Sequence, residues 1–207
     1  MRSRLVGVGV ALAAALALLA PGTAQAATSS VTISNFMFSP TPLKVKLGGQ
    51  VEWTNNGPST HTTTSDGVAD GSGDTGVGLW ASGSLGVSKT YGFTFTAAGS
   101  FPYHCSIHTF MRGDVRVPMK ASPKTGGVGT NFTVTWATVA PATDLVFDVQ
   151  EKAPGGKYVT IQNGVTSLST SFKPTNAGTY MFRSRVRRVS TGQSSDYSPA
   201  PKVVVTP

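Results

Sequence analysis

Hydrophobic and polar residues alternate along most of the chain, and no segment of residues 27–207 keeps the 3.6-residue period of an amphipathic helix. Apolar side chains at every second residue predict short strands with one buried face. In the first half these strands carry Val31 and Ile33, Leu43, Val45 and Leu47, Val51 and Trp53, Tyr91, Phe93 and Phe95, and Phe101, Tyr103 and Cys105. In the second half they carry Phe132, Val134 and Trp136, Leu145, Phe147 and Val149, and Tyr180, Phe182, Ser184 and Val186. With 24 glycines and 13 prolines available for turns, the pattern predicts an all-β fold.

The chain divides into two halves of different charge. The strand pattern is interrupted between them by Pro118, Pro123, Gly126 and Gly127. Residues 27–117 carry five basic and five acidic residues, whereas residues 118–207 carry ten basic and four acidic residues. All three histidines and the one cysteine precede the interruption. We expect two domains, residues 27–117 and residues 118–207, each of ordinary domain size.

The first 26 residues have the pattern of a cleavable export signal. Arg2 and Arg4 precede an apolar run from Leu5 to Ala20, and Ala24-Gln25-Ala26 offers small residues to a signal peptidase. The alternative is an uncleaved anchor, but this run is shorter than the roughly 20 residues of a spanning helix. We therefore predict cleavage after Ala26 and an exported protein, secreted, periplasmic or at the cell surface. The exported chain should have no membrane span and no nucleic-acid partner.

The chain has few residues able to bind a metal, and this limits the kinds of metal site that it can form. One cysteine excludes an intramolecular disulfide, and three histidines exclude a multicopper oxidase or a nitrite reductase. Strand alternation turns Cys105 inward with Tyr103, so Cys105 is either an inert core thiol or a ligand. A tight turn after Cys105 would bring His108 and Met111 round the same point, and His61 follows a loop elsewhere in this half. Two histidines, one cysteine and a weak methionine suit copper in a trigonal site with a long axial bond.

The first half resembles the cupredoxins, the small plastocyanin-like and amicyanin-like blue copper proteins. The resemblance covers nearly all of residues 29–117. It rests on segments 35–40, 51–55 and 98–103, on the His61-Thr62 step, and on Tyr103-His104-Cys105 followed by Ser-Ile-His-Thr-Phe-Met-Arg-Gly. It implies a cupredoxin Greek-key β-sandwich with one mononuclear type 1 copper, whose ligands by position are His61, Cys105, His108 and Met111. The departures from the family pattern are Trp80, where phenylalanine is more common, and a Gly/Asp-rich insertion, Asp66–Gly78.

The resemblance also implies a carrier of single electrons rather than an enzyme. In the family the histidine of the Cys-x-x-His loop lies within an apolar surface patch. We therefore expect an unidentified redox protein to dock near His108, with Phe110 beside it. Two alternatives would use the same ligands: an extracellular copper carrier or buffer, and an adhesion protein in which the copper is structural.

Two further groups near the ligands are expected to bind no metal. His104 stands beside Cys105, but strand alternation turns it away from the thiol, and we expect a structural role for it. The spacing of Asp66, Asp70 and Asp74 suggests calcium, yet the glycines around them do not match a calcium-binding loop. We expect these acidic side chains to be solvated.

The second half looks like a fibronectin type III domain. The likeness is based on the strand that contains Tyr180 and Phe182, on residues 194–199 and on the valines at positions 203–205. Another immunoglobulin-like sandwich is the alternative. Either would be a binding or spacer module. The polar face of the same strand carries Arg183, Arg185 and Arg187. This stripe predicts an anionic cell-surface polymer as partner, and an ordinary solvated strand face is the other interpretation.

Overall fold

Every regular element between Ala27 and Pro207, the residues that this computed structural model describes, is a β-strand. The predicted export signal, residues 1–26, lies outside the described residues. A search of residues 27–207 finds no helix with the length and hydrophobicity needed to cross a membrane. The all-β prediction is confirmed.

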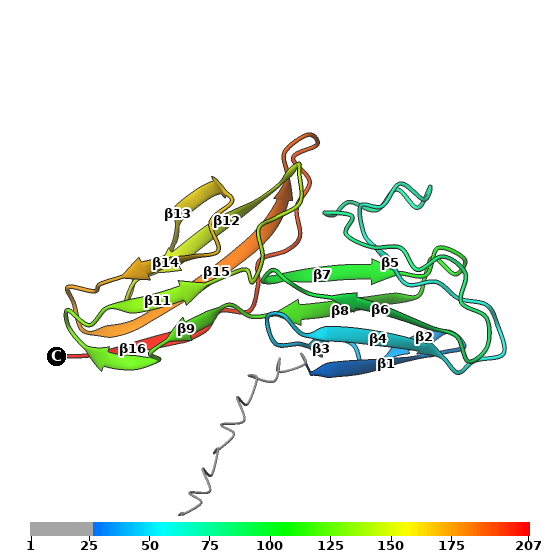
Figure 1. Cartoon of the computed structure of the whole chain (residues 1–207), viewed down its shortest axis with the longest axis horizontal. Helices are drawn as coiled ribbons and strands as arrows, with labels where there is room; N and C mark the ends of the chain where they lie inside the picture. The colour runs from blue at the N-terminus through cyan, green and yellow to red at the C-terminus, as the bar shows by residue number, and fades with distance from the viewer. Residues whose placement is uncertain (1–26) are drawn as a thin grey trace, which may run out of the picture.

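The first half is a β-sandwich of two sheets, with strand orders β2-β1-β4-β6 and β3-β8-β7-β5 (Figure 1). Its strands are β1 (Thr28–Ser34), β2 (Met37–Ser39), β3 (Leu43–Lys44), β4 (Gln50–Asn55), β5 (Thr64–Ser65), β6 (Thr90–Thr94), β7 (Gly99–His104) and β8 (Arg112–Val117). β1 runs parallel to β4, and β3 runs parallel to β8. The alternating apolar residues fill the space between the sheets, as the period of two predicts, with Trp53 and Phe101 among the fully buried side chains.

The second half also contains two sheets, with strand orders β14-β11-β9 and β10-β16-β15-β12-β13. Its strands are β9 (Lys120–Ser122), β10 (Thr125–Gly127), β11 (Phe132–Thr135), β12 (Leu145–Lys152), β13 (Tyr158–Val165), β14 (Ser169–Phe172), β15 (Gly178–Arg188) and β16 (Lys202–Thr206). Phe132, Trp136 and Phe182 are fully buried in its core. The predicted inward residues of β11, β12 and β15 are buried, except that Leu145 is half-buried.

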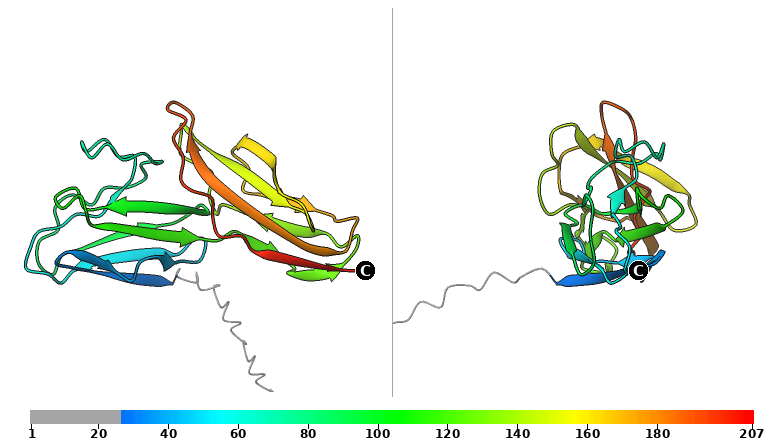
Figure 2. Two further views of the ribbon diagram at one scale, coloured as in Figure 1. Left: turned by 180° about the vertical axis from the view of Figure 1, so that it is seen from behind. Right: turned by 90° about the vertical axis from the view of Figure 1, so that its right-hand side faces the viewer.

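Hydrogen bonds join the two halves, which lie end to end along the long axis of the molecule (Figures 1 and 2). The backbone N–H of Ala98 donates to the carbonyl of Trp136 at 2.7 Å. Ser100 and Asp196 exchange two backbone hydrogen bonds, each of 3.0 Å. A cavity of about 370 Å³ lies at this junction, and its lining includes Leu79, Phe93, Phe95 and Phe101 from the first half and Val139, Pro141, Leu145, Phe147 and Val186 from the second. The halves are therefore docked on each other.

The arginine stripe of β15, formed by Arg183, Arg185 and Arg187, contacts other side chains of the second half. Asp148 of β12 is buried and accepts hydrogen bonds from Arg185 at 3.0 Å and from Arg187 at 2.9 and 3.0 Å. Arg183 stacks between the rings of Tyr158 and Tyr197, at 3.8 and 4.4 Å from their centroids. Burial would raise the pKa of Asp148, but the hydrogen bonds from Arg187, the Gly164 amide and Arg185 lower it overall. The predicted position of the stripe, opposite the apolar face, is confirmed, and its charge is partly neutralised by Asp148.

We predict that Asp148→Asn destabilises the second half by about 2 kcal/mol at pH 7, because two arginines would lose a buried anionic partner. Since folding lowers the pKa of Asp148, its stabilisation is complete above the ordinary value of about 3.9 and is lost as the pH falls below it. Urea unfolding at pH 7 and at lower pH should show the gap between variant and wild type narrowing in acid. Asp196→Asn, the same change at an exposed site, is the control. An equal loss in both variants would contradict the role of Asp148.

Candidate metal centre

The turn between β7 and β8 carries three of the four expected ligands. Cys105 directly follows β7, and its backbone N–H donates to the carbonyl of Met111 at 3.2 Å. The N–H of Met111 donates to the carbonyl of His108 at 2.8 Å. These bonds close a tight turn, as the sequence predicts. His61 comes from the segment between β4 and β5, where it exchanges two backbone hydrogen bonds with Leu85.

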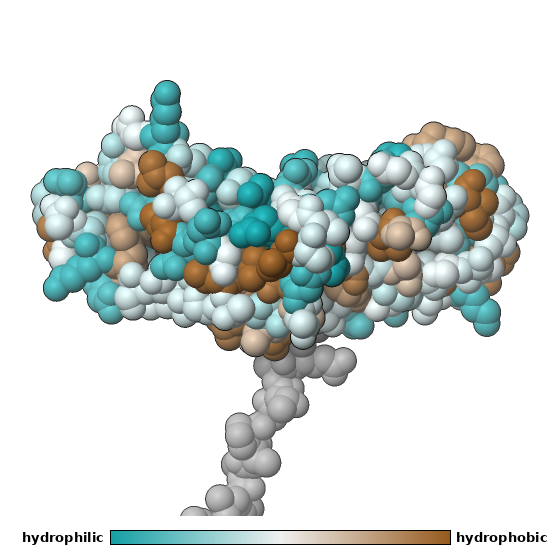
Figure 3. All heavy atoms as spheres, turned by 90° about the horizontal axis from the view of Figure 1, so that it is seen from above, coloured by the Kyte–Doolittle hydropathy of each residue, from teal (hydrophilic) through white to brown (hydrophobic). Residues whose placement is uncertain are grey.

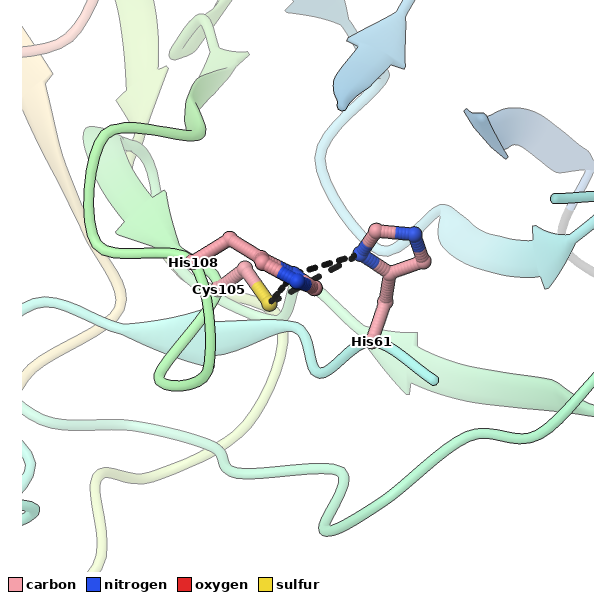
Figure 4. Close-up of side chains that lie close together, drawn as sticks. All are labelled: His61, Cys105 and His108. Carbon is pink, nitrogen blue, oxygen red and sulfur yellow. Dashed lines mark hydrogen bonds between the residues drawn. The ribbon is translucent and has the colours of Figure 1, made fainter. Parts of the chain in front are cut away.

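Three ligand atoms converge on one point (Figure 4). The Sγ of Cys105 lies 3.9 Å from the Nδ1 of His61 and 3.6 Å from the Nδ1 of His108, and the two Nδ1 atoms are 3.2 Å apart. A point equidistant from all three atoms lies about 2.1 Å from each, close to the bond lengths of about 2.0–2.1 Å for metal–nitrogen and ~2.3 Å for metal–sulfur seen with zinc. The three residues therefore fit one metal ion in a trigonal arrangement.

Hydrogen bonds orient the ring of His61. Its Nε2 lies 3.0 Å from the Oδ1 of Asn35. Because an amide oxygen can only accept, Nε2 carries the proton and Nδ1 presents its lone pair to the thiol. Burial, and the charge of His108 when protonated, lower the pKa of His61. The ring is thus held in the neutral form that binds a metal.

The thiol lies in a closed environment. Cys105, His61 and Met111 are buried. The Sγ of Cys105 accepts a hydrogen bond from the backbone N–H of Thr62 at 3.3 Å, and the Oγ1 of Thr62 accepts one from the N–H of Ser106 at 2.8 Å. The residue that follows His61 is therefore bound both to the thiol and to the turn that holds it.

An apolar rim surrounds His108, which is the only partly exposed residue of the four. Phe36, Ile107 and Phe110 are 48%, 49% and 70% exposed. The ring of Phe36 lies 4.9 Å from that of His108 and 5.8 Å from that of Phe110, centroid to centroid. Exposed phenylalanines in contact with one another mark an interaction surface. Phe110 is expected from the sequence, whereas Phe36 comes from the β1–β2 turn and is not.

Comparison with known proteins identifies the first half. Residues 25–118 match a family described as copper binding proteins of the plastocyanin/azurin family. Amicyanin-alpha from Methylorubrum extorquens is 32% identical over 124 residues, which cover 56% of this chain and 99% of that protein. The chain belongs to the plastocyanin/azurin family. Its cofactor is therefore copper, and the donor set of soft sulfur and neutral imidazole fits that ion.

Two further proteins are similar to part of this chain. Amicyanin from Paracoccus denitrificans is 33% identical over 87 residues, which make up 42% of this chain. The chain spans 63% of the length of that amicyanin. Among solved structures, a purple cupredoxin from Nitrosopumilus maritimus is 26% identical with a TM-score of 0.38, over 43% of this chain and 98% of that one.

A second polar cluster lies next to the candidate copper ligands, around His104. The Nδ1 of His104 is 2.7 Å from Asp66 and 3.3 Å from Asp74, and its Nε2 is 2.7 Å from Asp70. The imidazole is buried. Burial alone would lower the pKa of His104, but the hydrogen bonds to Asp66 and Asp70 outweigh it and raise that pKa. The three carboxylates, expected to be solvated, instead enclose a histidine, and the ring next to Cys105 has the structural surroundings that alternation predicts.

These carboxylates belong to the Asp66–Gly78 insertion. The insertion therefore folds over the start of the turn that runs from Cys105 to Met111, which we call the copper turn. Asp74 also pairs with Arg112, the residue after Met111. On its far side, the insertion is held by the second half, because Arg188 donates to the carbonyls of Val77 at 3.0 Å and Gly78 at 3.3 Å. Contacts thus run from β15 through the insertion to both ends of the copper turn.

The sequence did not reveal this role of the insertion. Asp66 and His104 are 38 residues apart, and no short motif joins them. The one available signal was burial: a histidine turned into a second layer needs polar partners, and carboxylates are the strongest ones. Arg188 gave no signal, because its partners in the insertion are backbone carbonyls.

We predict that Arg188→Gln loosens the insertion without unfolding either half. The variant loses the ion pair of Arg188 with Asp144 within the second half as well as the two hydrogen bonds to the insertion. Loss of the two hydrogen bonds should raise the exchange rate of the Gly78 amide, which donates to the carbonyl of Asp66 at 3.0 Å, by about tenfold. Hydrogen–deuterium exchange of residues 66–78 measures this. Arg116→Gln removes an arginine that pairs with Asp114 away from the insertion, and it serves as control. Unchanged exchange in the Arg188 variant would contradict the proposed contact.

Proposed function

We propose that the protein carries single electrons between redox partners through one type 1 copper ion. The observation that carries this proposal is the triangle formed by the Cys105 thiol and the imidazoles of His61 and His108, buried on one side and rimmed by apolar residues on the other. The relatives named above are amicyanins and a cupredoxin. Their likeness supports electron transfer as the function of this chain.

Each proposed ligand has a distinct role. Bound copper supplies the one-electron couple between Cu(II) and Cu(I). Cys105 would bind copper as the thiolate and provide the strong, coloured bond. His61 and His108 would bind it through neutral imidazoles, and Met111 would be a weak further donor that tunes the potential.

The surroundings of the ligands favour a geometry that does not change with oxidation state. Asn35 fixes the ring of His61, and the Thr62 amide fixes the thiol. Burial of Cys105 and His61 keeps water away from the thiol sulfur and from the imidazole nitrogens. Because these groups are held by the sheet rather than by the metal, little reorganisation is needed when an electron enters or leaves.

The partly exposed His108 is the proposed port for electrons. It connects the buried metal site to the rim formed by Phe36, Ile107 and Phe110. Apolar residues are visible at this end of the molecule, on the right in the space-filling view (Figure 3). We propose that a redox protein with a matching apolar face docks here, since desolvation of such a patch stabilises a short-lived complex.

No substrate-transforming site is proposed. A second copper would need further imidazoles, and both ring nitrogens of His104 already face carboxylates at 2.7 Å. The alternative of a copper carrier or buffer predicts rapid metal exchange, which the burial of Cys105 and His61 disfavours. The alternative of structural copper in an adhesion protein predicts no fast electron exchange with any partner.

We also propose that residues 118–207 form a fibronectin type III-like domain, beside a copper domain of residues 27–117. One sheet of three strands faces one that contains β16, β15, β12 and β13. The hydroxyl of Tyr180, near the start of β15, donates to the carbonyl of Asn176 at 3.1 Å. A tyrosine bonded back to the chain just before its own strand is typical of such sandwiches. Export after cleavage at Ala26 belongs to the same proposal.

An anionic polymer at Arg183, Arg185 and Arg187 stays a prediction. Two of the three arginines are bound to Asp148, and the third lies between tyrosine rings. Their charge is therefore less available to a polymer than the sequence pattern indicates.

We predict that the wild-type protein binds one copper ion per chain and is blue when oxidised, and that Cys105→Ser loses the colour. Serine offers no thiolate for charge transfer at neutral pH. Visible and electron-paramagnetic spectra of protein loaded with copper measure the effect. His104→Gln, which removes the one histidine not assigned to copper, is the control and should keep the visible band. A blue Cys105 variant, or a His104 variant that is folded by circular dichroism yet colourless, would show that the ligand set is wrong.

We predict that Met111→Leu raises the reduction potential by tens of millivolts and keeps the copper bound. The thioether is a weak donor that favours the more highly charged ion, so its loss favours Cu(I). Redox titration of the visible band gives the potential. Met119→Leu, the same change at another buried methionine, should leave the potential unchanged. A potential that falls, or that shifts equally in both variants, would rule out this role of Met111.

A further inference from the structure

The two kinds of basic residue are used differently in this protein. Each of the nine ion pairs within the described part of the chain involves an arginine or His104, and none involves a lysine. Of the arginines that the sequence singles out, Arg185 and Arg187 pair with Asp148, and Arg183 lies over two tyrosine rings. The positive charge that remains free for an outside partner is carried by lysines.

Five of these lysines gather in two adjoining clefts. One cleft, of about 310 Å³, is lined by Lys44, Lys46 and Lys120, and the other, of about 560 Å³, is lined by Lys44, Lys120, Lys124 and Lys202. All five side chains are exposed. No acidic residue lines either cleft, and Lys44 and Lys120 belong to both. We call the two clefts together the lysine groove.

Pairing between strands keeps the lysines of the groove together. Lys44 lies in β3 beside β8, and Lys120 begins β9, three residues after β8 ends. The carbonyl of Lys124 accepts a hydrogen bond at 2.9 Å from the Val204 amide, and Lys202 shares the exposed face of β16 with Val204. The groove therefore combines β3 of the first half with β9 and β16 of the second.

The floor of the groove is apolar, with Pro118, Pro199 and Pro201 in one cleft and Leu47 in the other. Alternation of fixed apolar surface with mobile ammonium groups suits a chain of sugar rings that bear acidic groups. Lysine acts as a compact point charge on a flexible stem, so it tolerates variation in the spacing of its anionic partners.

We propose that the lysine groove binds a linear acidic polysaccharide. A concave surface with charges along two connected clefts matches an extended chain better than it matches a flat membrane. Cleavage after Ala26, as proposed above, would place the new α-amino group in the same groove, because Ala27 lines one of its clefts. The groove lies at the junction of the halves, whereas His108 lies beyond the other end of β7, so a bound polysaccharide leaves the electron port open (Figure 1).

Binding of the copper-loaded protein to dextran sulfate, with uncharged dextran as the control polymer, tests the proposal. We expect binding to dextran sulfate alone, with an affinity that falls at least tenfold between about 0.05 and 0.5 M salt. Lys44→Gln combined with Lys120→Gln removes the two lysines shared by both clefts and should weaken binding by about tenfold. Lys157→Gln combined with Lys173→Gln removes the same charge outside the groove and should change the affinity by no more than about twofold.

Three results would overturn the proposal: no binding to dextran sulfate, an equal loss in the two double variants, or a loss in Arg183→Gln that matches the groove variant. Vesicles of phosphatidylglycerol form a further arm, with phosphatidylcholine vesicles as control. Binding to the anionic vesicles as tight as binding to dextran sulfate would assign the groove to a membrane surface instead. The copper spectrum should be unchanged in every variant, which shows that each has folded and separates this test from that of electron transfer.

Discussion

The antiparallel pairing of β7 with β8 is the constraint on which the rest of the structure depends. The register runs from Gly99 opposite Val117 to His104 opposite Arg112. Once it is fixed, Cys105 and Met111 must face each other across the turn that joins the strands. A Cβ atom at Gly113 would overlap the ring of Tyr103, so the close approach of the two strands needs glycine at that position. At its other end β7 bonds to the second half, so one strand carries both the copper turn and the junction.

Strand periodicity and short spacing brought three of the four proposed ligands together because Cys105, His108 and Met111 are close in sequence. A strand that ends in an inward cysteine, followed by a histidine and a methionine at short spacing, leaves few ways to place three sulfur and nitrogen donors. The role of Gly113 is a contact that periodicity does not contain, because the missing Cβ atom provides room for the ring of Tyr103. The alternation of apolar and polar residues predicts which face of the strand a side chain lies on, but it does not predict which residue the side chain contacts.

The polar partners were the part that the sequence could not predict. Alternation placed Arg185 and Arg187 on one face of β15, yet only the register between β12 and β15 puts Asp148 beneath them. Likewise the acids of the insertion were expected in water, and they enclose His104 because the chain returns over β7. Ion pairs between distant strands depend on register, which the charge pattern of a single strand does not contain.

The docked halves set the spatial relation between the proposed electron port and the lysine groove. Six residues of β7, at about 3.3 Å each, separate the copper turn from the junction by roughly 20 Å. The bonds between Ser100 and Asp196, and those from Arg188 to the insertion, hold this separation at two places. If a polysaccharide were bound by the lysines at the junction, His108 would therefore lie at a fixed distance from it. The second half, in this arrangement, would contribute to the proposed electron transfer by position rather than by chemistry.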